Sequence, residues 1–456
     1  MRVLAALLVL VATAQWHPEE RVMLSDFSYV DAVAASPWTV FAATRHGLLL
    51  YDRVARAWRP PVTTLDGYPT ARVRSAVADQ TGNAVWLGIG GVDGYVRYDV
   101  DARMWTRGAA PPAGQTLTVA AALARAPAAD AIRALILTDP RLRSYQFTAA
   151  ASTPDRPDLY LGTNGMGLVR VDPQTGEWEA LPYGLLATGV GAIAPAPDGI
   201  WAATNARLTW VAADLSATRT TEGGGAALGF TFRAARRLVA TSGALWLATE
   251  QGVLWIDPRT MRSRLFDLRD VTSLAPAPDG VWVGTARGLS VITRDGNVVR
   301  VSTDFPVLSL VAARETLWVG TTAGVVMLPP GRADAVGVAA LSQPIFAIGR
   351  VGDTIVAATD RSLVWRDPAT GAWKELPLSL ALGRPTALTV DPNGGLWIGA
   401  TQGLARADLA RAFVRALTVP VDLPAAVRDV LADQDYLWAA TDSGLVRFDR
   451  RAVSSR

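Results

Sequence analysis

The chain has 456 residues, no cysteine and two histidines, and its 44 basic residues nearly balance its 41 acidic ones. Without cysteine it can form neither a disulfide nor a thiolate metal site, and two histidines are too few for a multi-histidine metal site. The arginines are scattered among acidic residues rather than gathered in a stripe, which argues against nucleic-acid binding although the sequence pI is 9.4.

The first fourteen residues have the pattern of a secretory signal peptide. An apolar run from Val3 to Val11 follows Arg2 and leads into Ala12-Thr13-Ala14. This run is much shorter than the ~20 residues that a membrane span needs. We therefore predict cleavage after Ala14 and a mature chain, residues 15–456, that is periplasmic or secreted and has no membrane span.

One phrase recurs along the rest of the chain. It consists of an aliphatic residue, Trp, an aliphatic residue, Gly or Ala, Thr, two variable residues, Gly and a second apolar run, as in Val281–Ile292. Neighbouring copies are 36 to 45 residues apart, except for one gap of 74. The Trp position of the copies falls at Phe41, Trp86, Tyr160, Trp201, Trp246, Trp282, Trp318, Val356, Trp397 and Trp438. This period predicts an all-β fold, a β-propeller in which each repeat is one four-stranded blade.

The repeat at Val271–Ser302 shows how one blade is built. Its four apolar segments are separated by Pro278-Asp279-Gly280, Ala286-Arg287-Gly288 and Asp295-Gly296, residue types that favour tight turns. We expect the Trp of the second strand to pack between blades, because aromatic side chains supply the largest buried area. The Gly or Ala two residues later would keep that face of the sheet thin.

The two ends of the chain complement each other. The last repeat ends at Arg456 without a convincing fourth strand, whereas the mature N-terminus has a spare apolar segment at Arg21–Ser25. We expect this segment to complete the last blade and to close the ring, which removes open sheet edges. No linker or second spare strand appears midway. We therefore favour a single closed ring of about ten blades over two small rings in tandem.

The gap of 74 residues contains an Ala- and Pro-rich stretch. Within it, Thr116–Arg125 and Ala129–Leu137 have helical composition, with apolar residues on one face of the second segment. We predict a helical insertion at residues 109–143 on the loop-bearing face, where it would cap the channel or dock a partner. The alternative is a degenerate blade.

The fragments Leu159–Thr204 and Leu388–Asp408 resemble the two-component regulator propeller repeat, with its Asp-x-x-Gly, Leu-Trp-Ile-Gly-Thr and Gly-Gly-Leu elements. The resemblance covers nearly the whole mature chain, and it implies a propeller outside the cytoplasm. In that family such propellers form the periplasmic sensing half of membrane histidine kinases, often those that respond to oligosaccharides. We find no kinase or receiver region here. The resemblance therefore implies a fold and a setting, but neither signalling nor a set of ligand-binding residues.

In a propeller, the turns between second and third strands share one face with the links between blades. Those turns carry variable polar residues on a fixed scaffold, as binding faces commonly do. We take them as candidate ligand-binding residues, with ordinary solvated turns as the alternative. The candidates are Arg45, His46, Asn164, Asn205, Arg207, Glu250, Gln251, Arg287, Asp360, Arg361, Gln402 and Asp442.

Catalytic signatures are mostly absent. No GxSxG elbow occurs, a Ser-His-Asp triad would depend on His46 alone, and the turn at Asp391–Gly394 lacks the ligand pattern of a calcium loop. We expect no catalytic residue, no metal and no cofactor. The predicted function is a monomeric, non-catalytic propeller that binds a carbohydrate or other small molecule, or scaffolds a protein complex. The alternative is a propeller hydrolase or lyase that acts on glycans with paired channel carboxylates.

Overall fold

The computed structural model describes residues 16–17, 19–91, 93–108, 110–112, 117–134, 144–153, 155–205, 207–221, 232–301, 305–329, 336–337, 342–367 and 369–455. The signal-peptide prediction for residues 1–14 lies outside these residues. Within them, helices of the length and apolarity that crossing a bilayer would require are not found.

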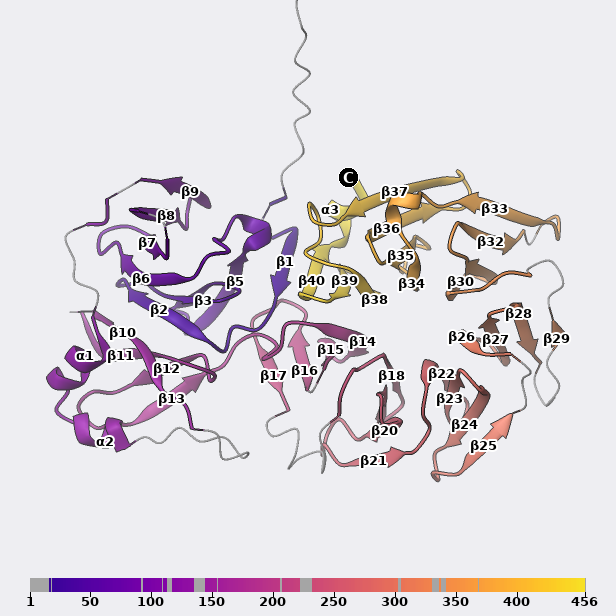
Figure 1. Cartoon of the computed structure of the whole chain (residues 1–456), viewed down its shortest axis with the longest axis horizontal. Coiled ribbons are helices and arrows are strands. Elements are labelled where there is room, and N and C mark those ends of the chain that lie inside the picture. Colours follow the sequence, from indigo (N-terminus) through magenta and orange to yellow (C-terminus); the bar gives the residue numbers. More distant parts are fainter. Residues whose placement is uncertain are drawn as a thin grey trace, which may run out of the picture.

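The described residues form ten four-stranded antiparallel sheets (Figure 1). The first three sheets are β2 (Val30–Ala35), β3 (Thr39–Thr44), β4 (Gly47–Asp52) and β5 (Ala57–Thr63); β6 (Val73–Ala78), β7 (Ala84–Ile89), β8 (Tyr95–Asp99) and β9 (Met104–Arg107); and β10 (Phe147–Thr153), β11 (Arg156–Thr163), β12 (Leu168–Val171) and β13 (Trp178–Leu181). The next three are β14 (Val190–Ala196), β15 (Gly199–Thr204), β16 (Leu208–Ala212) and β17 (Thr218–Thr220); β18 (Arg237–Thr241), β19 (Ala244–Ala248), β20 (Val253–Ile256) and β21 (Ser263–Phe266); and β22 (Val271–Ala277), β23 (Gly280–Thr285), β24 (Gly288–Thr293) and β25 (Val298–Val301).

The remaining four sheets come from the C-terminal part of the chain. They are β26 (Val307–Ala313), β27 (Thr316–Thr321), β28 (Gly324–Leu328) and β29 (Val336–Gly337); β30 (Ala347–Val351), β31 (Thr354–Ala358), β32 (Ser362–Arg366) and β33 (Trp373–Pro377); β34 (Pro385–Val390), β35 (Leu396–Ala400), β36 (Gly403–Asp408) and β37 (Phe413–Thr418); and β38 (Val427–Ala432), β39 (Tyr436–Thr441) and β40 (Gly444–Asp449) with β1 (Arg21–Leu24). The described helices are α1 (Val119–Arg125), α2 (Ala129–Ala134), α3 (Arg450–Ser455) and two short 3₁₀ turns, η1 (Thr64–Asp66) and η2 (Leu380–Leu382).

The N-terminal strand completes the last sheet, as the ends of the sequence predicted. β1 pairs with β40 in antiparallel register, from Arg21 opposite Phe448 to Leu24 opposite Leu445. Gly444, at φ +152°, permits this approach, because a Cβ there would collide with the carbonyl oxygen of Leu24.

The sheets do not follow one another in a single ring of ten. The first strands of seven sheets contact one another in a cycle that runs through β14, β18, β22, β26, β30, β34 and β38 and returns to β14. We call these seven sheets the seven-sheet ring. In the other three, β2 contacts both β6 and β10, so the sheets lie in the order β10–β13, β2–β5, β6–β9 beside the ring (Figure 1). We call them the three-sheet arc.

Hydrogen bonds between first strands fix this order. In the seven-sheet ring, Thr272 and Thr386 each donate through Oγ1 to the first residue of the following sheet, Val307 and Val427. In the arc, Thr148 of β10 makes the same bond to the carbonyl of Val30 in β2. The sheet β2–β5 thus follows β10–β13 in space although it precedes it in the chain. The expectation of one ring in chain order is therefore wrong.

The small residue of each second strand is needed for this packing. A Cβ on Gly284 would collide with Val307 of the next sheet, and one on Gly162 would collide with Val30. The neighbouring tryptophans are deeply buried at several sheets, and Trp246, Trp397 and Trp438 are all at most 2% exposed. The repeated phrase is thus a sheet-packing motif.

The aspartates of the turns accept hydrogen bonds from the loop backbone and from tryptophan side chains. Asp391, which is 3% exposed, accepts the N–H groups of Asn393 and Gly395 on one oxygen and the indole N–H of Trp397 on the other. Asp433 holds Trp438 in the same way. Sequence reasoning assigned the segment around Asp391 to a turn, and these bonds give the physical reason.

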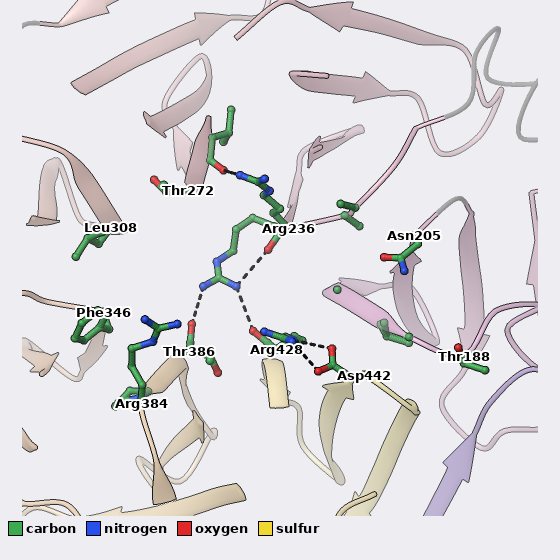
Figure 2. Close-up of a pocket in the computed structure, with 18 residues that line it drawn as sticks. Thr188, Asn205, Arg236, Thr272, Leu308, Phe346, Arg384, Thr386, Arg428 and Asp442 are labelled. Carbon is green, nitrogen blue, oxygen red and sulfur yellow. Dashed lines mark hydrogen bonds and ion pairs between the residues drawn. The ribbon is translucent and has the colours of Figure 1, made fainter. Parts of the chain in front are cut away.

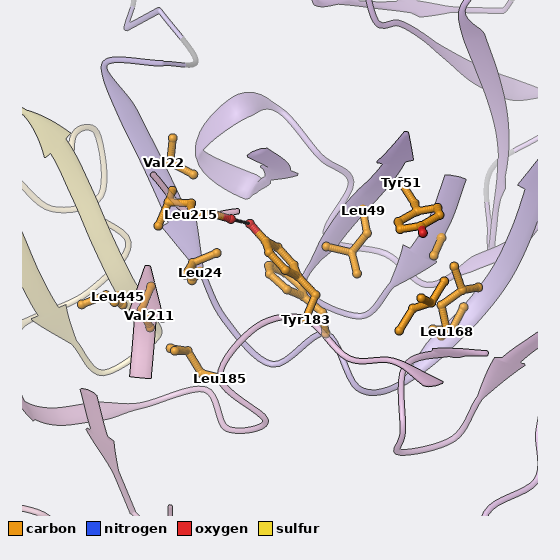
Figure 3. Packing of buried hydrophobic residues seen from close by; sticks show 14 of the residues in the cluster. Val22, Leu24, Leu49, Tyr51, Leu168, Tyr183, Leu185, Val211, Leu215 and Leu445 are labelled. Carbon is orange, nitrogen blue, oxygen red and sulfur yellow. Dashed lines mark hydrogen bonds between the residues drawn. The ribbon is translucent and has the colours of Figure 1, made fainter. Parts of the chain in front are cut away.

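An apolar junction joins the arc to the seven-sheet ring (Figure 3). Tyr183, in the link from β13 to β14, lies at its centre and is 3% exposed. Its aromatic ring stacks on Trp58 at a centroid distance of 5.3 Å and on Phe27 at 6.3 Å. Its hydroxyl donates to the carbonyl of Leu215 at 3.0 Å. Side chains of β1, β4, β12, β16 and β40 complete the cluster.

The described helices between β9 and β10 pack on a sheet of the arc. Ala122 and Leu123 of α1, Ala126 directly after it and Ile132 of α2 pack against apolar residues of β10–β12 such as Leu161. Residues 109, 113–116 and 135–143 of the predicted insertion lie outside the described residues. The described part of the insertion does not line the central cavity described below, and its role as a cap or a docking segment stays a prediction.

A threonine ends the second strand in most repeats and organises the following turn. Thr285 donates through Oγ1 to the carbonyl of Gly288 at 3.0 Å and accepts the N–H of Arg287 at 3.1 Å. The threonines that make the equivalent donation are Thr44, Thr163, Thr204, Thr249, Thr321, Thr359 and Thr441.

Replacing this threonine by its isostere should test the motif. We expect Thr285→Val to lower the free energy of unfolding by about 1–3 kcal/mol, because two backbone polar groups lose their partner in a site that is 8% exposed. The measurement is denaturant unfolding. Thr322→Val, at an exposed turn position of the next sheet, is the control and should change the stability by less than about 0.5 kcal/mol. Equal effects of the two variants would contradict the assignment.

Candidate functional site

A cavity of about 590 Å³ opens at one end of the seven-sheet ring (Figure 2). All seven sheets contribute to it, mostly through the links that lead into their first strands. Residues that begin β14, β18, β22 and β34 line it, and Asn205 and Asp442 reach it from turns between second and third strands. The two loop classes thus share one face, as the propeller geometry predicted. We call this space the central cavity.

Arg237 lies across the central cavity. Its guanidinium donates through Nη2 to the carbonyl of Thr386 at 2.6 Å and through Nη1 to the carbonyl of Arg428 at 3.2 Å. Arg237 begins β18, whereas its acceptors belong to β34 and β38, which do not adjoin β18 in the ring. One side chain therefore ties non-adjacent sheets together.

Three further arginines line the central cavity. Arg428 forms a two-pronged ion pair with Asp442, at 2.7 and 2.6 Å, and this bond raises the pKa of the guanidinium. Arg236 reaches the carbonyl of Val271 at 3.5 Å. Arg384 is exposed and lies over the aromatic ring of Phe346 at 5.3 Å, and within the described residues its side chain makes no hydrogen bond or ion pair.

A half-buried carboxylate lies next to this cationic cluster. Asp429, adjacent in sequence to Arg428, accepts the N–H of Ile193 at 3.1 Å and that of Val430 at 3.0 Å. Loss of hydration raises the pKa of Asp429, and the positive charge of Arg237 and the hydrogen bond from Ile193 oppose that rise. Among the described residues that line the cavity itself, Asp442 is the only carboxylate.

A second cavity, of about 740 Å³, lies where the arc meets the seven-sheet ring. Arg45, His46 and Asn164 reach it from the arc, and Arg207 reaches it from the ring. We call it the junction cavity. The guanidinium of Arg45 stacks on Tyr29 at 3.7 Å from the ring centroid.

The structure distributes the twelve candidate residues over three places. Asn205 and Asp442 line the central cavity, and Arg45, His46, Asn164 and Arg207 line the junction cavity. The other six lie on turns outside both cavities: Glu250, Gln251, Arg287, Asp360, Arg361 and Gln402. Of these, Arg287 approaches Asp270 at 3.9 Å and Arg361 approaches Asp360 at 3.7 Å.

The arginines of the central cavity were not among the candidates. Arg236, Arg237 and Arg384 stand immediately before or at the start of a first strand, and Arg428 is the second residue of β38. The sequence did contain a signal for these arginines, because basic residues recur in the links that lie on the same face as the turns between second and third strands. The candidates predicted from the sequence all stand on turns between second and third strands. The described residues contain no group of three or more His, Asp or Glu side chains arranged to hold a metal ion.

Solved structures that are similar to this chain include two extracellular domains of bacterial regulators and a lyase. The extracellular domain of a hybrid two-component system from B. thetaiotaomicron matches with 14% identity and a TM-score of 0.49, over 93% of this chain and 69% of that one. The extracellular domain of a one-component system from the same organism matches with 11% identity and a TM-score of 0.47, over 92% and 70%. A virginiamycin B lyase from Staphylococcus aureus matches with 14% identity and a TM-score of 0.46, over 57% and 94%.

Neither a known protein-family profile nor a curated protein matches the chain.

Proposed function

We propose that this protein is a non-catalytic binding protein outside the cytoplasm, a seven-bladed propeller with an attached arc, whose central cavity takes an anionic ligand. One observation carries the proposal: four guanidinium groups line one cavity that offers a single carboxylate among its described residues. That carboxylate, Asp442, is already paired with Arg428. The local charge is therefore positive.

The arginines of the central cavity differ in their bonding, and this difference supports ligand binding in addition to a structural role. Arg237 and Arg428 are held by protein acceptors, so they supply a fixed positive field. Arg384 keeps its hydrogen-bond donors for a ligand, and the face of Phe346 orients it. A cavity of about 590 Å³ suits a small molecule with one or two carboxylate or phosphate groups.

The glycan hydrolase or lyase alternative receives less support. Hydrolysis by paired carboxyl groups needs two of them about 5–10 Å apart and facing the substrate. Among the described lining residues Asp442 stands alone, and its oxygens already accept two bonds from Arg428. Binding is the better account of this arrangement.

Calorimetric titration of residues 15–456 with citrate, inorganic phosphate and a neutral sugar tests the proposal. We expect the anions to bind and the binding to weaken with added salt. Arg384→Gln should weaken binding at the central cavity by about 10- to 100-fold, because it removes a charge-assisted hydrogen bond.

The matched control is Arg314→Gln, since Arg314 is exposed and pairs with Asp353 away from the cavity. It should leave binding unchanged. Preferential binding of the neutral sugar, or an equal loss in both variants, would overturn the proposal.

A further inference from the structure

The junction cavity joins polar side chains that are far apart in the sequence. Tyr29 precedes β2, Arg45 and His46 form the turn from β3 to β4, and Asn164 follows β11. Arg207 alone comes from the seven-sheet ring, from the turn between β15 and β16. An occupant of this cavity would therefore touch the arc and the ring at once.

Arg45 is prepared to receive an oxyanion. Arg45 is exposed and its guanidinium carbon lies over the phenol ring of Tyr29, 3.7 Å from the ring centroid, and within the described residues its side chain makes no hydrogen bond or ion pair. Stacking restricts the orientation of the guanidinium plane but does not consume the N–H donors at its edge. Those donors match the geometry of a carboxylate or a phosphate.

Basic side chains outnumber carboxylates among the described residues that line the junction cavity. Asp26 is the only carboxylate there, and its Oδ1 accepts the N–H of Ser28 at 3.0 Å. Two guanidinium groups, those of Arg45 and Arg207, line the same cavity. This lining favours an anion over a cation.

Three further polar side chains line the junction cavity. The Asn164 side-chain oxygen accepts the N–H of Gln146 at 2.8 Å, which leaves its amide nitrogen as a donor. The imidazole of His46 and the phenol of Tyr145 lie on the same cavity. Gly165 makes room for Tyr145, because an added Cβ would lie 2.5 Å from its aromatic ring.

We propose that the junction cavity is a second anion-binding site, separate from the central cavity, for a small carboxylate or phosphate. Arg45 holds the oxyanion, Arg207 adds positive charge from the seven-sheet ring, and Asn164 donates a hydrogen bond. Because the occupant contacts the arc and the ring together, its binding also strengthens their attachment.

Titration calorimetry with citrate and, separately, with inorganic phosphate tests this site. Citrate reports on a carboxylate ligand and phosphate on a phosphate ligand. We expect two sites per chain for at least one of them. Arg45→Gln should remove or weaken one site by about 10- to 100-fold and leave the other intact. Arg384→Gln should do the reverse.

Gly165→Ala provides a second variant that keeps every charge. It should displace Tyr145 and weaken the same site as Arg45→Gln, while thermal unfolding reports whether each variant is folded. A single site that only Arg384→Gln removes would overturn the second site and leave the proposed function standing. A single site that only Arg45→Gln removes would support the junction site and overturn binding in the central cavity. Absence of binding by both anions would overturn both.

Discussion

A chain that begins at Ser25 is expected to melt at least ~10 °C below the chain that begins at Gln15. Val22, Met23 and Leu24 of β1 are at most 5% exposed, and burying three such side chains stabilises by roughly 5–9 kcal/mol. The truncation also leaves β40 as an unpaired edge. The side chain of Arg21, which donates to the carbonyls of Val421, Asp422 and Leu65, is lost as well.

Differential scanning calorimetry measures this change. A synthetic peptide of residues 16–28 should restore part of the lost melting temperature by pairing with β40. A peptide of the same composition in scrambled order is the control and should restore none. If the truncated chain melts at the original temperature, β1 does not hold the C-terminal sheet and the pairing with β40 is wrong.

Tyr183→Ala is expected to separate the arc from the seven-sheet ring. The substitution leaves a cavity beside Phe27 and Trp58, and it should cost about 3–5 kcal/mol. Tyr183→Phe keeps the stacking and removes only the hydroxyl that bonds to Leu215, so about 1–2 kcal/mol should be lost.

Differential scanning calorimetry distinguishes the separation of the arc from the ring from a general loss of stability. The wild-type chain should melt in one transition, and Tyr183→Ala should split it in two, because the arc and the ring then unfold separately. Trp178→Ala, on an outer strand and 43% exposed, is the control and should keep a single transition. A single, equally shifted transition in Tyr183→Ala would mean that the junction does not couple the two parts.

Much of the local structure could be predicted from the sequence. The four-stranded repeats, their turns and the pairing of Arg21–Leu24 with the last sheet follow from residue patterns that act over short distances. The missing fourth strand of the last repeat was itself a signal, because an open edge must be paired or protected.

The order of the sheets could not be predicted in the same way. Gly162 and Gly284 occupy the same place in the phrase, yet one packs on an earlier sheet and the other on the next. The faces of the repeats are similar to one another. The repeated motif therefore predicts that each sheet packs against another sheet, but it does not predict which one. Tyr183, in the link from β13 to β14, contacts Phe27, Trp58 and Leu215, and such long-range contacts have no periodicity in the sequence.

The site was only partly predictable for a related reason. Asn205 and Asp442 line the central cavity, and they stand on turns that the propeller geometry had predicted to share a face with the links between sheets. Arg384 directly precedes β34, and Arg237 is the first residue of β18. The links before these strands vary in length, so the sequence does not predict which of their side chains reaches the cavity. Their convergence depends on the closure of seven sheets, which is a property of the whole ring.

The hydrogen bonds of Arg237 also bear on how the seven-sheet ring can deform. Arg237 begins β18 and its guanidinium donates to carbonyls of β34 and β38. Movement of β18 away from those two sheets would therefore break charge-assisted hydrogen bonds. A small shift of one sheet is thus coupled to sheets that are not its neighbours.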